Sequence, residues 1–105
     1  NPQHNRKFFA LLQAIMLHQE LYLSTDDLLD GIKLALGHVK ESRNAETLEA
    51  VYTPASINFG AMDQEAFETF YQKAVDLICR RIIPGLNDAD LEREVDEILA
   101  GRGAR

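Results

Sequence analysis

Apolar side chains recur at intervals of three and four residues in the second half of the chain, which is the spacing of one face of an α-helix. The longest such run covers about four and a half turns and consists of Phe67, Phe70, Tyr71, Ala74, Val75, Ile78 and Ile82. Asp63 can cap this helix, and Met62 and Phe67 are placed to form a hydrophobic staple at its start. Pro84-Gly85 ends it. These signals predict a mainly α-helical chain.

Two further helices are predicted before this one. The first has an apolar stripe that consists of Phe8, Leu11, Leu12, Ile15 and Met16. Asn5 is its predicted N-cap, and the helix is expected to run to about Tyr22. The second begins after Ser24 or Thr25, either of which can cap it, and Gly37 is expected at its C′ position. The stripe of this second helix consists of Leu28, Leu29, Ile32 and Leu36.

Residues 38–59 separate the second helix from the third and show competing patterns. Segments 39–42 and 50–53 flank a polar stretch, and the second of them contains β-branched residues, which favours two short strands in a hairpin. Segment 45–51 alternatively suits a helix by its residue propensities. Residues 56–59 look extended, with Ile57 and Phe59 on one face. The predicted fold is therefore about four helices with a short hairpin or an irregular insert between the second and the third.

The fourth predicted helix is strongly acidic. Asn87 can cap it, Gly101 can end it, and its apolar stripe consists of Leu91, Val95, Ile98 and Leu99. Residues 88–97 carry six acidic side chains and one arginine, a local charge of −5. Such a surface repels DNA. It either binds a basic protein partner, through residues such as Asp90, Glu94 and Glu97, or keeps the domain soluble.

A length of 105 residues limits the chain to one domain, which is predicted to span residues 1–100. Residues 101–105 have nothing to bury and are expected to form a flexible tail. The sequence shows neither a signal peptide nor a stretch of about 20 nearly continuous apolar residues, so a cytoplasmic protein without a membrane span is expected. The formal net charge of −6 argues against a surface that binds nucleic acid all over, but is compatible with a local basic patch.

Neither a metal site nor an active site is predicted. His4 and His18 lie about four turns apart on the first helix, and His38 lies in or beside a loop, so the three histidines do not converge on one ion. The single cysteine, Cys79, excludes an internal disulfide and a multi-cysteine zinc site. The two arginines that follow it would lower the pKa of its thiol, but a small buried hydrophobe is the more common role of cysteine. The chain also lacks a phosphate-binding glycine loop and a nucleophile elbow, so no catalytic residue and no cofactor are expected.

Two groups of residues are candidates for contacts with nucleic-acid phosphates. The first group lies at the start of the first helix and consists of His4, Asn5, Arg6 and Lys7. The second group lies on the third helix and consists of Lys73, Arg80 and Arg81. The alternative for the first group is that its two cations only border the helix while Phe8 anchors it in the core. The alternative for the second is that Lys73, Asp76 and Arg80 pair with one another on a solvated face.

Residues 1–12, NPQHNRKFFALL, resemble the start of the helical part of a phage and prophage family of unknown function, in which the pattern is RNP-x-H-x-RKFFALL. Residues 54–67, PASINFGAMDQEAF, are similar to the S-I-x-F-x-x-M-D-x-x-x-F stretch of that family, and Phe70-Tyr71 and Val75-Asp76 continue the likeness. The resemblance covers about half of the chain. Segment 4–7 and the layout of helices also resemble, more distantly, the NinB/Orf recombination-mediator family of lambdoid phages.

The first resemblance implies that a further segment precedes this chain in the whole protein, which is consistent with a start at Asn1 rather than at methionine. The second implies a non-enzymatic, dimeric protein that binds single-stranded DNA and helps to load a recombinase onto strands coated by single-strand-binding protein. For this chain it implies an accessory role in phage DNA metabolism inside the bacterial host cell. Base stacking requires free aromatic rings, and Tyr22, Tyr52 and Phe59 lie off the buried stripes. The alternative is an interaction or inhibitor module that binds a host protein and no nucleic acid.

Overall fold

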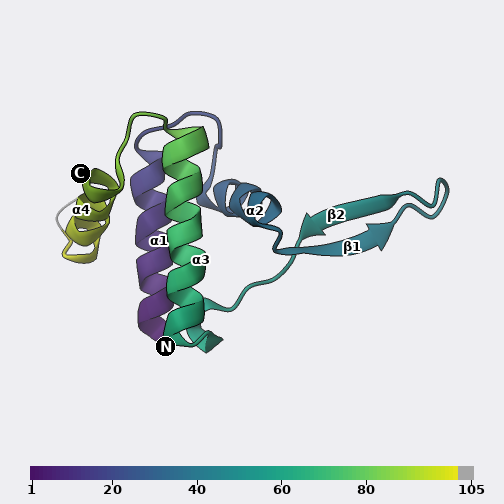
Figure 1. The fold of residues 1–105 in the computed structure, drawn as a ribbon, viewed down its shortest axis with the longest axis horizontal. Helices are drawn as coiled ribbons and strands as arrows, with labels where there is room; N and C mark the ends of the chain where they lie inside the picture. Colours follow the sequence, from purple (N-terminus) through teal and green to yellow (C-terminus); the bar gives the residue numbers. More distant parts are fainter. Residues whose placement is uncertain (102–105) are drawn as a thin grey trace.

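Four α-helices and a two-stranded sheet form residues 1–101, the part of the chain that the computed structural model describes (Figure 1). The elements in chain order are α1 (Pro2–Met16), α2 (Thr25–Leu36), β1 (Val39–Arg43), β2 (Ala50–Pro54), the 3-10 turn η1 (Phe59–Ala61), α3 (Gln64–Leu77), the π-helical turn η2 (Ile78–Ile82) and α4 (Asp88–Leu99). The predicted mainly α fold with a hairpin between the second and third helices is confirmed. The alternative of a helix over residues 45–51 is wrong, because these residues form the turn and the start of β2.

Three of the predicted helix starts are confirmed by their capping bonds. The side chains of Ser24, Asp63 and Asn87 each accept a hydrogen bond from the backbone N–H three residues later, at 3.0, 2.7 and 2.8 Å. Gly37 follows α2 with a φ of 79°, in the left-handed region where glycine carries no steric penalty. The second, third and fourth helices therefore begin where short-range chemistry places them.

The first helix differs from its prediction at both ends. Its N-cap is Asn1, whose side chain accepts a hydrogen bond from the backbone N–H of Gln3 at 2.9 Å, and Pro2 occupies the first helical position, for which its fixed φ is suited. Asn5 therefore lies inside the helix and does not cap it. The helix also ends before Tyr22, because the side chain of Gln19 accepts from the N–H of Tyr22 at 2.7 Å and donates to its carbonyl at 3.0 Å, which fixes a loop there.

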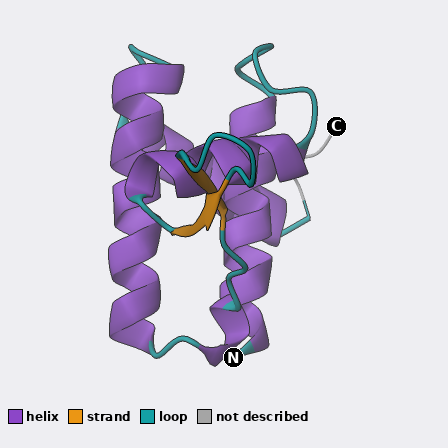
Figure 2. Ribbon diagram, turned by 90° about the vertical axis from the view of Figure 1, so that its right-hand side faces the viewer, coloured by secondary structure: helices purple, strands orange, loops and turns teal. Residues whose placement is uncertain are grey.

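α1 and α3 stand side by side and run in the same direction, with α4 packed against α1 and α2 crossing on the opposite side (Figures 1 and 2). Aromatic rings pack between α1 and α3. The ring of Phe8 stacks on that of Phe59 with centroids 4.3 Å apart and meets the rings of Phe67 and Tyr71 edge-on at 6.4 and 6.1 Å. Aliphatic side chains from all four helices complete one continuous core, among them Leu11, Leu12, Ile15, Ile32, Val75, Leu91 and Val95.

The segment 56–59 is not extended throughout, as the alternation predicted. Asn58 caps η1 by accepting a hydrogen bond from the backbone N–H of Ala61 at 3.2 Å. This turn buries the Phe59 ring under Phe8 and leaves Ile57 half-buried. Phe59 is therefore a core residue, and the expectation that its ring is free to stack on a base is wrong.

β1 and β2 pair antiparallel, with Val39 opposite Pro54 and Arg43 opposite Ala50. The hairpin projects from the end of α2 away from the helices, and residues 40–52 are all exposed (Figure 1). It makes the molecule elongated, with extents of 51 × 31 × 21 Å. Because an isolated two-stranded hairpin is only marginally stable in water, this arm depends on its attachment to the body at its root.

Gly101 follows α4 with a φ of 77° and so ends the helix as predicted. The rest of the predicted flexible tail, residues 102–105, lies outside the described residues. No helix among residues 1–101 has the length and apolar character that a membrane span requires.

Candidate functional site

His4, the first predicted nucleic-acid contact, is a core residue and is not available to a phosphate. Only 4% of its surface is exposed. Its Nδ1 lies 3.0 Å from the carbonyl oxygen of Phe59, and its Nε2 lies 3.0 Å from Oε1 of Gln64. Its ring stacks on that of Phe67, with centroids 4.2 Å apart and planes inclined by 2°. The structure therefore removes His4 from the candidate binding residues and makes it a link between α1, η1 and α3.

Arg6 and Lys7 lie near the start of α1, beside the end of α4, and differ in their surroundings. The ammonium of Lys7 lies over the ring of Tyr71, 4.6 Å from the centroid, so part of its role is a cation–π contact with the core. Both cations border a small depression together with Gln3 and Leu99. Asn5 and Arg6 also line the next depression along α1, so three of the four residues in the first predicted group reach one surface.

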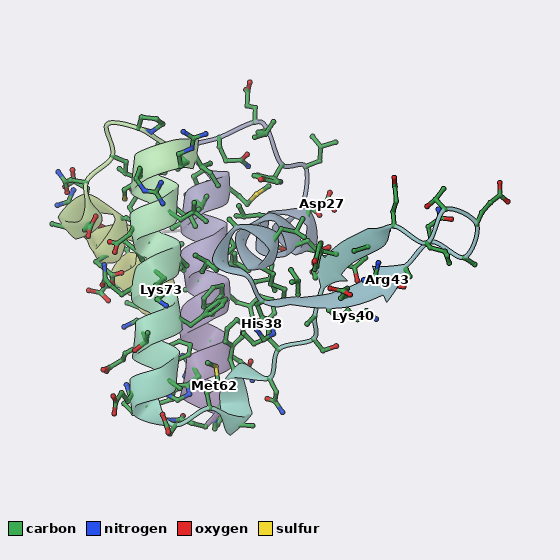
Figure 3. The ribbon with its side chains drawn as sticks, turned by 45° about the vertical axis from the view of Figure 1, so that its right-hand side comes forward. Asp27, His38, Lys40, Arg43, Met62 and Lys73 are labelled. Carbon is green, nitrogen blue, oxygen red and sulfur yellow. The ribbon has the colours of Figure 1, made fainter. Side chains whose placement is uncertain are left out.

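The second predicted group is divided between two other places. Lys73 lines a broad hollow between α2, η1 and α3, together with Leu36, Met62 and Phe70, and Figure 3 shows it on the side of the molecule that carries Met62 and His38. Arg80 and Arg81 are exposed in η2, about 24 Å along α3 from the end at which Arg6 lies. α1 and α3 run in the same direction, so the start of α1 and the end of α3 lie at opposite ends of the body (Figure 1). Arg80 and Arg81 therefore cannot form one patch with Arg6 and Lys7.

The expected ion pairs within the second group are absent from residues 1–101. Asp76 accepts instead from the side-chain amide of Gln72 at 3.0 Å. The described part of the chain has three acid–base pairs at 4 Å or less, Arg43–Glu41, Arg93–Asp90 and His18–Glu94, and none involves Lys73 or Arg80. The alternative of a self-paired face on α3 is therefore wrong for this structure.

We call the adjoining depressions along the outer side of α1 the α1 groove. There are three of them in order along the helix. Arg6 and Leu99 line both the first and the second, and Gln13 and Ile98 line both the second and the third, so the three form a continuous surface. From Gln3 to Leu17 the groove follows α1 for about 21 Å, at 1.5 Å per residue. One wall is the end of α4, and the far end reaches the loop before α2.

The chemistry of the α1 groove changes along its length. Its first part has the two cations and the side-chain amides of Gln3 and Asn5. Its middle has the ring of Phe9, which is 49% exposed, and the amide of Gln13. Its last part is apolar, with Met16, Leu17 and Leu23.

The α1 groove differs from the rest of the molecule in charge. The chain has 17 acidic and 11 basic residues, yet none of the described residues that line the groove is acidic. The groove therefore offers a ligand cations, amide donors and an exposed ring, and the described part of its walls has no acidic side chain. Such a combination suits an anionic ligand that has flat or apolar parts.

Phe9 is the functional candidate that sequence reasoning missed. It lies next to the core residue Phe8 in the sequence, about 100° further round the helix, at the border of the apolar stripe of α1. A helical wheel contains the signal, because it places Phe9 beside the polar residues Arg6 and Gln13, three residues before it and four residues after it. The other rings expected to be free are Tyr52, which is 56% exposed on the hairpin, and Tyr22, which is half-buried over Gly31 of α2.

Two of the three predicted partner-binding residues on α4 already have partners within the chain. Asp90 accepts from Arg93 at 2.8 Å, and both carboxylate oxygens of Glu94 lie within 2.8 Å of Nε2 of His18. The His18 contact ties α4 to the end of α1. Glu97 is half-buried and has no ion pair among residues 1–101. The acidic helix is thus used partly to hold the fold, which was not foreseen.

Two core-facing groups have shifted pKa values. Burial raises the pKa of the Cys79 thiol to about 11, and a hydrogen bond and negative charge from Asp88 add to the shift. The expectation that neighbouring arginines lower this pKa is therefore wrong. Burial also raises the pKa of Tyr71 well above its ordinary value, with further contributions from Glu92 and Asp96. Both groups are therefore uncharged at neutral pH.

No group of three or more histidine, cysteine, aspartate or glutamate side chains in the described range 1–101 is placed to hold a metal ion.

Comparison of the chain with protein-family models, with curated protein sequences and with solved structures finds no match.

Proposed function

We propose that this chain is a non-enzymatic accessory protein of phage or prophage DNA metabolism that binds single-stranded DNA, or a protein on that DNA, through the α1 groove. The observation that carries the proposal is the groove itself, in which Arg6 and the exposed ring of Phe9 lie on one helix face, with no acidic side chain among the described residues of its walls. Proteins that bind single strands combine cations that follow the backbone with aromatic rings on which bases stack.

The arrangement along α1 supports this assignment in detail. Arg6 and Phe9 are three residues apart, so they are neighbours on the helix surface. A base that stacks on Phe9 would therefore have its phosphate within reach of Arg6. The amides of Asn5 and Gln13 flank the ring and supply hydrogen-bond donors and acceptors for a base edge or a phosphate.

The test is the binding of a fluorescent oligothymidylate, followed by anisotropy at 50 and 200 mM salt. Phe9→Ala should weaken binding about 5- to 150-fold, because loss of stacking on one ring costs about 1–3 kcal/mol. Arg6→Gln should also weaken binding and should reduce the slope of log K against log salt by about 0.7, as expected for one phosphate contact on a single strand.

Arg80→Gln is the matched control, because it removes an exposed cation that lies about 24 Å along α3 from the end at which Arg6 lies. It should leave the oligonucleotide affinity within about twofold of the starting protein, since each phosphate contact acts locally at these salt concentrations. Equal effects of Arg6→Gln and Arg80→Gln, or an affinity that Phe9→Ala does not change, would refute the groove as the DNA site.

A second candidate function is a module that binds a host protein and no nucleic acid. The exposed leucines favour it, because Leu17 and Leu23 at the apolar end of the groove are 63% and 88% exposed and offer anchors for a protein but none for phosphates. It replaces the first proposal if no oligonucleotide binds at 50 mM salt.

A further inference from the structure

The outer edge of β2 is the part of the projecting arm with the least protection against strand pairing. Four uncharged residues occupy it, Ala50, Val51, Tyr52 and Thr53, and the first three are exposed. Val51 and Tyr52 are β-formers that are 44% and 56% exposed. Proteins normally block such edges with charged residues or cover them.

The outer edge of β1 is protected in this way. Lys40, Glu41 and Arg43 alternate in charge along it, and Glu41 accepts hydrogen bonds from the side chains of Tyr52 and Arg43 at 3.1 and 3.4 Å. A neighbouring strand would have to displace these charged groups from water. The two edges of the same hairpin therefore differ. β2 packs against α2 at its root, and its exposed residues 50–52 are the part that is open to a partner strand.

The backbone pattern shows which groups of β2 are free. The N–H of Ala55 donates to the carbonyl of His38 at 3.0 Å, and the N–H of Asn44 donates to the carbonyl of Glu49 at 3.0 Å. Hydrogen-bonded pairs alternate along an antiparallel ladder, so Val51 is bonded to Ser42 within the hairpin. The N–H and C=O groups of residues 50 and 52 therefore point out of the hairpin, toward solvent.

We propose that this edge pairs antiparallel with β2 of a second copy of the chain and forms a four-stranded sheet about a two-fold axis at Val51. In that register Ala50 of each copy faces Tyr52 of the other, so the outward N–H and C=O groups satisfy one another. Pro54, which has no N–H, lies outside the bonded pairs.

Charge complementarity favours a second copy as the occupant. The tip of the arm carries Glu46 and Glu49 beside Arg43, which donates to the carbonyl of Leu48 at 2.9 Å, and its root carries His38 and Lys40. A two-fold axis at Val51 places Glu49 of each arm opposite Thr53 of the other, and Lys40 lies next to that Thr53. Pairing through the arms also keeps the two helical bodies apart, which reduces the repulsion between chains that each carry −6.

This proposal does not depend on the function of the α1 groove. The arm leaves the body from the end of α2 (Figure 1), whereas the residues that line the groove come from α1, the end of α4 and the loop before α2. A dimer joined by its arms would leave both grooves open, so loss of dimerisation and loss of ligand binding are separate results.

A cysteine cross-link tests the register directly. Val51→Cys is made in a Cys79→Ser background so that the new thiol is the only one. The residue on the axis forms a non-hydrogen-bonded pair with its copy, with Cα atoms about 4.5 Å apart, which is within the range of a disulfide. Mild oxidation should convert most of this protein to a covalent dimer. Ser42→Cys in the same background is the matched control, because Ser42 lies beside Val51 on the other strand and should give at least tenfold less dimer.

Sedimentation equilibrium of the unmodified chain gives an independent readout. The chain should be dimeric at tens of micromolar, and Val51→Lys should raise the dimer dissociation constant at least tenfold, because it places two like charges at the axis. Ser42→Lys should leave the constant within about twofold. A monomeric unmodified chain, or equal cross-linking at positions 42 and 51, would overturn the proposal.

Discussion

Replacing His4 by alanine should cost this protein a large share of its stability, because the ring joins three elements at once. It is 4% exposed, and its two nitrogens each lie 3.0 Å from an oxygen of a segment more than 50 residues away, the Phe59 carbonyl and the Gln64 side chain. It also stacks on Phe67 at 4.2 Å. Removal of the ring would leave a cavity beside Phe67 and would take the hydrogen-bond partner from a carbonyl.

The expected loss is about 3–4 kcal/mol. Truncation of a buried aromatic ring to alanine costs about 3–5 kcal/mol, and the imidazole ring is smaller than the rings from which that range comes. An unpaired buried carbonyl adds about 1–3 kcal/mol, part of which water recovers when it enters the cavity. A domain of this size has a free energy of unfolding of about 5–15 kcal/mol. The melting temperature should therefore fall by at least about 12 °C.

Urea denaturation followed by circular dichroism measures this loss, with His4→Phe as the comparison. Phenylalanine keeps the stack on Phe67 and loses only the hydrogen bonds, so it should cost about 1–3 kcal/mol and retain oligonucleotide binding within about twofold. The reasoning fails if His4→Ala costs less than about 1 kcal/mol. It also fails if His4→Phe, while still folded, abolishes binding, because His4 would then contact the ligand.

Two further outcomes follow from close contacts in the structure. Gly31→Ala should destabilise the protein in urea titrations, because the new Cβ would lie 2.6 Å from the hydroxyl of Tyr22. In a Tyr22→Ala background the same substitution should stabilise the protein by up to about 1 kcal/mol, because alanine has the higher helix propensity. A gain in stability in both backgrounds would contradict the contact. The thiol of Cys79, whose pKa is raised to about 11, should react slowly with iodoacetamide at pH 8. Its rate should rise about tenfold per pH unit toward pH 11, because the thiolate is the reactive form. Labelling at pH 8 at the rate of a free cysteine would refute this.

The elements of this fold that could be predicted from the sequence are those set by short-range chemistry. Ser24, Asp63 and Asn87 act within one helical turn of themselves, and their capping bonds lie where their types place them. The hairpin was harder to predict because segment 45–51 has mixed propensities. Asn44 decides it locally, since its side chain accepts from the N–H groups of Glu46 and Thr47 at 2.8 and 3.0 Å and closes the turn.

The parts that could not be predicted depend on contacts between distant segments. Nothing near His4 in the sequence indicates that Gln64 will face it, because that contact requires α1 and α3 to run in the same direction with their starts together. The same alignment separates Arg6 from Arg80, although both looked equally suited to bind phosphates. The His18–Glu94 contact likewise forms only because α4 packs on α1.

The net charge of the chain is a weak guide to what the α1 groove binds. Screening limits the reach of an exposed charge to about 8 Å at physiological ionic strength, and the groove follows α1 for about 21 Å. Acidic residues elsewhere on the surface therefore act weakly on a ligand beside Arg6, whereas the absence of acidic side chains among residues 1–101 that line the groove acts strongly. At an ionic strength of 0.01 M the screening length grows to about 30 Å. The net charge of −6 then acts over the whole molecule and slows the approach of an anion. The slope of the oligonucleotide titration at 50–200 mM salt therefore reports the local contact, whereas a separate measurement of the association rate at lower salt would report the charge of the whole molecule.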